Sequence, residues 1–121
     1  MTKVTDDDNS SSGDALSGTS WEWTDSYYSS NYYWKETVTL TFKTGGNGTI
    51  VIKDEDSYYG TEIETNSFTY TYNSRTKTGT IKARKYDSYR DQYTNVTYDF
   101  EVDGNKLYFY DDEEDIVFTR K

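Results

Sequence analysis

The chain has 121 residues, a net charge of −9, 14 Tyr, 5 Phe and 3 Trp, and no Cys, His or Pro. This length suits one domain. The negative charge argues against nucleic acid and anionic membrane surfaces as partners, because both are bound through Lys and Arg patches. The missing Cys and His exclude disulfides, thiol chemistry and the usual zinc or haem ligands, so we expect no cofactor.

The N-terminal segment differs in composition from the rest of the chain. Met1 to Gly18 holds an acidic run followed by a Ser-rich stretch, with little to bury. We therefore predict a flexible acidic tether over residues 1–18 and one folded domain over residues 19–121. Such tethers commonly follow the lipid-anchored cysteine of bacterial surface lipoproteins. We expect an extracytoplasmic protein, lipid-anchored at the bacterial cell envelope, in which the export signal was removed and Met1 replaces that cysteine. The alternative is an ordinary disordered N-terminus.

From Thr19 onward the sequence alternates between apolar and polar residues with the period of a β-strand. The clearest example is residues 37–42, where Val38, Leu40 and Phe42 share one face and three threonines share the other. The pattern predicts eight strands, at residues 19–24, 37–42, 49–53, 68–72, 80–85, 96–102, 106–110 and 115–120. We expect an all-β, eight-stranded antiparallel up-and-down barrel, because closure removes the exposed edges of an open sheet. A β-sandwich is the alternative.

The predicted connections are of two kinds. Short Gly- and Asn-containing turns follow the second, fourth and sixth strands, as tight hairpins require. Longer aromatic and acidic loops follow the first, third, fifth and seventh strands, at residues 25–35, 54–65, 87–93 and 111–114. The tripeptide Asp-Ser-Tyr begins at positions 25, 56 and 87, a repeat of 31 residues. Alternate loops of a meander lie at the same end, so all three copies should lie on one rim.

The rim tyrosines are the candidate ligand-binding residues, while Asp and Ser are ordinary turn-forming residues. Tyr and Trp are favoured at recognition surfaces, and loop aromatics are costly to expose unless they pack together or contact a partner. Self-packing that caps the barrel is the alternative. The candidate residues are Tyr27, Tyr28, Tyr32, Tyr33, Trp34, Tyr58, Tyr59, Tyr89 and Tyr93.

Trp21 and Arg120 are predicted to form a structural latch. Both residues lie near the end of the barrel opposite the rim, one on the first strand and one on the last, so they meet if those strands pair. A guanidinium stacked on an indole suits such a position. With Gly18 before Trp21, the chain resembles the lipocalin-like (calycin) barrels, in which a Gly-x-Trp motif near the first strand packs against an Arg near the last. Here one extra residue separates Gly18 from Trp21, and the chain is short for that family.

The resemblance is closest to the small lipocalin-like domains of secreted bacterial lipoproteins, whose functions are mostly undescribed. The chain has no His or Cys to act as general base or nucleophile, which argues against an enzyme. The acidic run at residues 111–115 could bind Ca²⁺, but it lacks the spacing of an EF-hand, so we predict a solvated hairpin and no metal.

Two functions fit this sequence. The first is an extracytoplasmic binding domain that holds a small molecule or glycan at the tyrosine-rich rim. The second is a structural or protein-interaction module whose barrel is filled by aromatic side chains. A small-molecule binder needs a pocket of several hundred Å³ at the rim. In either case we expect a monomer.

Overall fold

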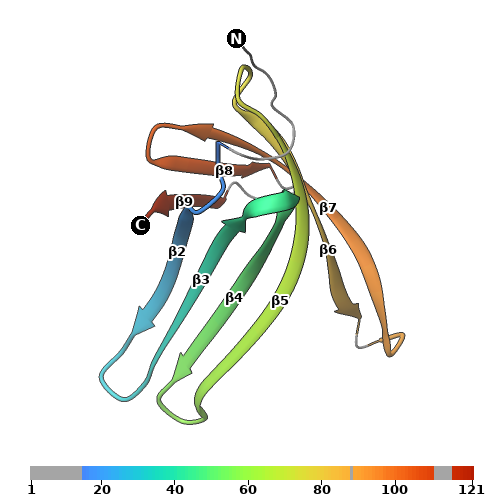
Figure 1. The fold of residues 1–121 in the computed structure, drawn as a ribbon. Coiled ribbons are helices and arrows are strands. Elements are labelled where there is room, and N and C mark those ends of the chain that lie inside the picture. The colour runs from blue at the N-terminus through green and yellow to red at the C-terminus, as the bar shows by residue number, and fades with distance from the viewer. Residues whose placement is uncertain (1–14, 88, 111–115) are drawn as a thin grey trace.

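The structure is a computed structural model that describes residues 15–87, 89–110 and 116–121. Within these residues, eight antiparallel strands follow one another around a closed barrel, and the first pairs with the last (Figure 1). The predicted up-and-down barrel is confirmed. The strands are β2 (Ser20–Tyr28), β3 (Tyr33–Lys43), β4 (Asn47–Asp56), β5 (Gly60–Asn73), β6 (Thr78–Asp87), β7 (Gln92–Asp103), β8 (Lys106–Tyr110) and β9 (Ile116–Arg120).

The strands reach further toward the rim than the sequence pattern predicted. Much of the predicted rim loops is strand, since β2 runs to Tyr28, β3 begins at Tyr33 and β5 begins at Gly60. These segments are rich in Tyr and Thr, which favour extended backbone, so alternating acidic residues did not end the strands. Between β2 and β3 and between β4 and β5, only short turns remain at the rim. The opposite, closed end holds the η2 turn (Thr44–Gly46) between β3 and β4.

The hydrophobic core fills the closed half of the barrel with aromatic rings. Phe42 packs edge-on against Tyr70 and Phe68, with centroids 4.7 Å and 5.6 Å away, and lies 5.8 Å from Phe100. Burial of rings in this geometry is strongly stabilising. The buried core residues are Leu16, Trp21, Leu40, Phe42, Phe68, Tyr70, Tyr72, Ile81, Phe100, Val102, Leu107, Phe109 and Phe118.

One core arrangement occurs twice. Gly48 pairs with Phe68, and a Cβ on Gly48 would overlap the Phe68 ring. Gly79 pairs with Phe100 in the same way, with its Cβ position 2.6 Å from the Phe100 Cζ atom. Each glycine therefore provides the space for an aromatic ring from the neighbouring strand. This requirement gives a physical reason for the similar sequences around Gly48-Thr49-Ile50 and Gly79-Thr80-Ile81.

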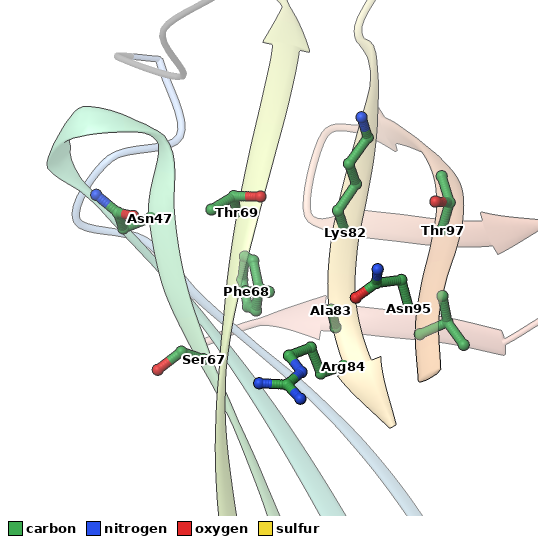
Figure 2. Close-up of a pocket in the computed structure, with 10 residues that line it drawn as sticks. Asn47, Ser67, Phe68, Thr69, Lys82, Ala83, Arg84, Asn95 and Thr97 are labelled. Atoms are coloured by element: carbon green, nitrogen blue, oxygen red, sulfur yellow. The ribbon is translucent and has the colours of Figure 1, made fainter. Parts of the chain in front are cut away.

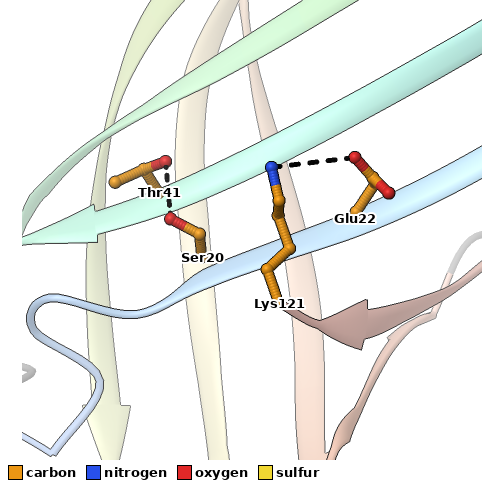
Figure 3. Close-up of polar contacts among 4 residues, drawn as sticks. All are labelled: Ser20, Glu22, Thr41 and Lys121. Carbon is orange, nitrogen blue, oxygen red and sulfur yellow. Dashed lines mark hydrogen bonds and ion pairs between the residues drawn. The ribbon is translucent and has the colours of Figure 1, made fainter.

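The predicted latch closes the barrel. Trp21 lies opposite Arg120 in the β2–β9 pair, and the Arg120 guanidinium lies 5.9 Å from the centre of the Trp21 ring. Lys121 adds an ion pair to Glu22 at 3.8 Å, close to the hydroxyl contact between Ser20 and Thr41 (Figure 3). Trp21 is fully buried and its indole N–H donates to the Thr19 hydroxyl at 2.9 Å. These residues serve closure, as predicted.

Packing begins slightly before the predicted domain boundary. Residues 15–18 form a turn, and Leu16 is buried in the core. Gly18 N–H donates to the Phe42 carbonyl at 2.8 Å, which ties this turn to β3. Leu16 therefore belongs to the folded domain, whereas the composition predicts it to be part of the tether. The remaining tether residues, 1–14, lie outside the described residues.

The barrel forks between β5 and β6. These strands pair from Phe68 opposite Ala83 to Asn73 opposite Thr78. Residues 60–67 of β5 have register partners only in β4, and residues 84–87 of β6 only in β7. Figure 1 shows the two strands diverging toward the rim. In the described part of the chain, the wall is therefore continuous only in its closed half.

Candidate binding surface

The three tyrosine-rich turns lie at the rim end, but the fork separates them into two groups. The β2–β3 and β4–β5 turns adjoin, since Ser57 N–H donates to the Tyr33 carbonyl at 3.0 Å and Tyr33 N–H donates to the Ser57 hydroxyl at 3.0 Å. The β6–β7 turn is on the other side of the fork (Figure 1). The prediction that these alternate turns lie at one end of the barrel is therefore correct, but only the first two turns adjoin, and the third lies apart from them.

Six tyrosines lie on the two adjoining hairpins, and we call them the tyrosine surface. Successive residues of a strand face opposite sides of a sheet, so Tyr27 and Tyr28 of β2 lie on opposite faces. Four of the rings stack in pairs: Tyr28 on Tyr33 with centroids 5.9 Å apart, and Tyr32 on Tyr58 at 5.1 Å. Stacking does not bury these rings, because Tyr28 and Tyr58 remain 67% and 70% exposed. Tyr59, which follows Tyr58 in the same turn, is 87% exposed. The members are Tyr27, Tyr28, Tyr32, Tyr33, Tyr58 and Tyr59.

Asp56 fixes the geometry of this surface. Its carboxylate accepts the Tyr32 hydroxyl at 2.7 Å and the backbone N–H groups of Tyr58 and Tyr59 at 2.8 Å and 3.1 Å. The hydrogen bond from Tyr32 is the main cause that lowers the pKa of Asp56, and the same bond raises the pKa of Tyr32. The turn-forming role predicted for Asp-Ser is thus correct at Asp56. It is wrong at Asp25, which lies within β2.

The remaining candidate aromatics lie apart from the tyrosine surface or only border it. Trp34 is a half-buried residue of β3, opposite Tyr27 in β2 and Asp56 in β4. Tyr93 lies in β7 beneath the Arg84 guanidinium, at 4.9 Å from its ring centre. Tyr89, in the β6–β7 turn, is fully exposed.

The inner face of β2–β5 carries a row of carboxylates between the core and the rim. Asp25 lies opposite Glu36, Glu36 opposite Asp54, and Asp54 opposite Glu62. This row continues the core-facing side of the strands, two residues beyond Val38. Burial is the main cause that raises the pKa of Glu36, followed by the charge of Asp54, a hydrogen bond to it, and the charge of Asp25.

The largest of the described cavities, about 590 Å³, lies at the fork and away from the tyrosine surface. Figure 2 shows Phe68 and Thr69 of β5 on one side and Ala83 and Arg84 of β6 on the other, with Arg84 extending toward β5. Its lining residues are Asn47, Ser67, Phe68, Thr69, Lys82, Ala83, Arg84, Asn95, Val96 and Thr97. No pattern in the sequence predicts this cavity, because it depends on where β5 and β6 separate.

Among the described residues, no group of three or more carboxylates is arranged to hold a metal ion, and no helix has the length and apolar character of a membrane span. The predicted solvated hairpin at residues 111–115 lies outside the described residues. Comparison of the chain with protein-family models, with curated proteins and with solved structures gave no match.

Proposed function

We propose that this chain is a non-enzymatic, extracytoplasmic binding module that contacts a partner protein through its tyrosine surface. One observation carries the proposal: the tyrosines of these two turns are ordered by ring contacts and by Asp56, yet all of them except the half-buried Tyr32 stay exposed. A preordered aromatic surface loses little conformational entropy on binding. Large exposed aromatic groups are also typical of protein interfaces.

The filled barrel supports a surface contact over ligand capture inside the barrel. Aromatic side chains occupy the closed half, and the cavity at the fork is lined by none of the tyrosine surface. This arrangement fits the second function suggested by the sequence. The lipocalin-like resemblance and the location at a bacterial cell envelope belong to the same proposal, and they rest on the Trp21–Arg120 latch and on the composition of the tether.

A glycan is the second candidate ligand, because sugar rings also stack on exposed tyrosines. The hydrogen bonds of Asp56 weigh against it. Both carboxylate oxygens already accept bonds from Tyr32, Tyr58 and Tyr59, so the acid nearest the stacked rings has little capacity left for sugar hydroxyls.

The test replaces Tyr28, Tyr58 and Tyr59 by Ala together. A photo-crosslinking amino acid at position 33 should capture a distinct protein from envelope extracts of the source cells. The triple variant should lose this product, because it removes most of the exposed ring area. The control Tyr110→Ala removes a tyrosine that is 52% exposed on β8 and should leave capture unchanged.

A thermal-shift screen with oligosaccharides separates the two candidates. A protein-binding module should show no change in midpoint, because only a ligand of the native state raises it. A sugar that raises the midpoint of the wild type, and not of the triple variant, would replace the partner-protein proposal with the glycan.

A further inference from the structure

The fork leaves one edge of β5 without a strand partner. Residues 60–67 pair with β4 on one side, and in the described structure no strand pairs with them on the other. An edge of this length is a template for another extended chain. Ile63 is 64% exposed here, so the edge also carries apolar surface.

The hydrogen-bonding pattern identifies which backbone groups face this free edge. Ser57 N–H bonds to the Tyr33 carbonyl, which sets the alternation along the β3–β4 ladder. In antiparallel strands, hydrogen-bonded pairs of residues alternate with non-hydrogen-bonded pairs. The backbone N–H and C=O groups of Ile52 and Asp54 in β4 therefore point to Glu64 and Glu62 of β5. The N–H and C=O groups of the intervening residues, Thr61, Ile63, Thr65 and Ser67, therefore point to the free edge.

The side chains beside this edge define the charge of what would bind there. Glu62 and Glu64 lie on the inner face, next to the carboxylate row. On an added strand, the residues opposite them would form non-hydrogen-bonded pairs, where side chains approach most closely. Opposite charges in such pairs stabilise a sheet and like charges destabilise it. A second copy of this chain, with its net charge of −9, is thus a poor occupant.

We propose that the free edge of β5 binds an extended, cationic polypeptide segment as an added strand. Its inward residues would be Lys or Arg opposite Glu62 and Glu64, and its outward residues would be β-branched, beside Ile63 and Thr65. The segment would end at the cavity at the fork, where Phe68, Ala83 and Val96 can receive an apolar side chain. Lys82 and Arg84 line the same cavity and exclude a cationic residue from that end. This site is separate from the tyrosine surface and does not depend on it.

The test uses a fluorescent eight-residue peptide with blocked ends that alternates lysine and valine. Binding is followed by fluorescence anisotropy at low salt. Thr65→Pro deletes one edge-facing N–H without removing a bond to β4, whereas the matched variant Thr65→Val keeps it. We expect Thr65→Pro to weaken binding by up to about tenfold, the value of one hydrogen bond, and Thr65→Val to leave it unchanged.

Further probes keep the result decisive if the proline variant folds poorly. Two further versions of the peptide, N-methylated at its odd or at its even residues, are tested with the wild-type protein. Only the version whose methyl groups replace the N–H groups that face β5 should bind more weakly. A peptide alternating glutamate and valine should not bind. Equal binding of the alternating peptide and a peptide with its lysines grouped at one end would overturn the proposal, because it would show charge attraction without strand addition.

Tyr28→Ala separates this proposal from the function proposed above. Tyr28 is at the tip of β2, three strands from β5 along the sheet. This variant should bind the lysine–valine peptide as the wild type does. Loss of peptide binding in Tyr28→Ala would place the peptide on the tyrosine surface and contradict the assignment to β5.

Discussion

At the scale of single residues, Gly79 shows how closely the core is packed. A Cβ at this position would overlap the Thr71 carbonyl and come within 2.6 Å of the Phe100 ring. Gly79→Ala should therefore lower the free energy of unfolding by about 1–3 kcal/mol, as overpacking does. Urea denaturation measures this change. Gly104→Asn is the control, because Gly104 has open space around its Cβ position and a φ of 60° that Asn accepts. Similar losses in both variants would contradict the packing explanation.

Glu36 is a residue whose negative charge the fold disfavours. Its pKa is raised above the ordinary value of 4.5, so the folded state binds the proton more tightly than the unfolded state. Stability must then fall as the pH rises from the ordinary pKa through the folded one. Glu36→Gln should increase the free energy of unfolding at neutral pH by up to ~1 kcal/mol, the scale of a cross-strand like-charge pair. Below the ordinary pKa, where wild-type Glu36 is protonated in both states, the gain should vanish.

The control for this prediction is Glu55→Gln, which changes the net charge equally. Glu55 lies one residue from Asp54 in β4, opposite Lys35, so its removal deletes an attractive neighbour. Urea denaturation at several pH values should show stabilisation for Glu36→Gln and none for Glu55→Gln. Equal stabilisation of both would mean that total net charge, and not the carboxylate row, limits stability.

At the scale of elements, the β2–β9 pair depends on the latch. Trp21 is fully buried and Arg120 lies over its ring while remaining exposed. Arg120→Ala should cost about 0.5–1 kcal/mol, as expected for an exposed cation–π contact. In a double-mutant cycle, the same change should cost less when Trp21 is already replaced by Leu. Lys121→Ala removes only an exposed ion pair and should have little effect. An Arg120→Ala cost independent of residue 21 would show that the ring contact contributes nothing.

Sequence alternation predicted the elements well and their ends poorly. The barrel, the strand order and the Trp21–Arg120 contact follow from the alternation of apolar and polar residues along each strand, which also tells which residues share a face. The carboxylate row could have been found the same way, because Glu36 has the parity of Val38 and Leu40. The fork could not. Where β5 leaves β6 depends on sheet curvature summed over many residues, and this separation also moved Tyr89 and Tyr93 away from the other rim tyrosines.

At the scale of the whole molecule, the two halves of the barrel should differ in stability. The closed half holds the core and a continuous wall, whereas the rim half has the free edge of β5 and few buried apolar residues. Local opening is easiest where buried contacts are fewest. Amide hydrogen exchange should therefore be slow for β5 residues 68–73 and fast for residues 60–67, apart from those bonded to β4.

Within residues 60–67 the exchange should alternate. The amides of Glu62, Glu64 and Asn66 bond to β4 and should be protected, whereas those of Thr61, Ile63 and Thr65 face the free edge and should exchange with little protection. Exchange followed by NMR at single residues resolves this pattern, and β4, paired on both sides, is the internal control. Uniform protection along residues 60–67 would mean that another strand covers this edge in solution. Uniformly fast exchange would mean that the β4–β5 ladder itself opens at the rim, so that the free edge is not a stable template.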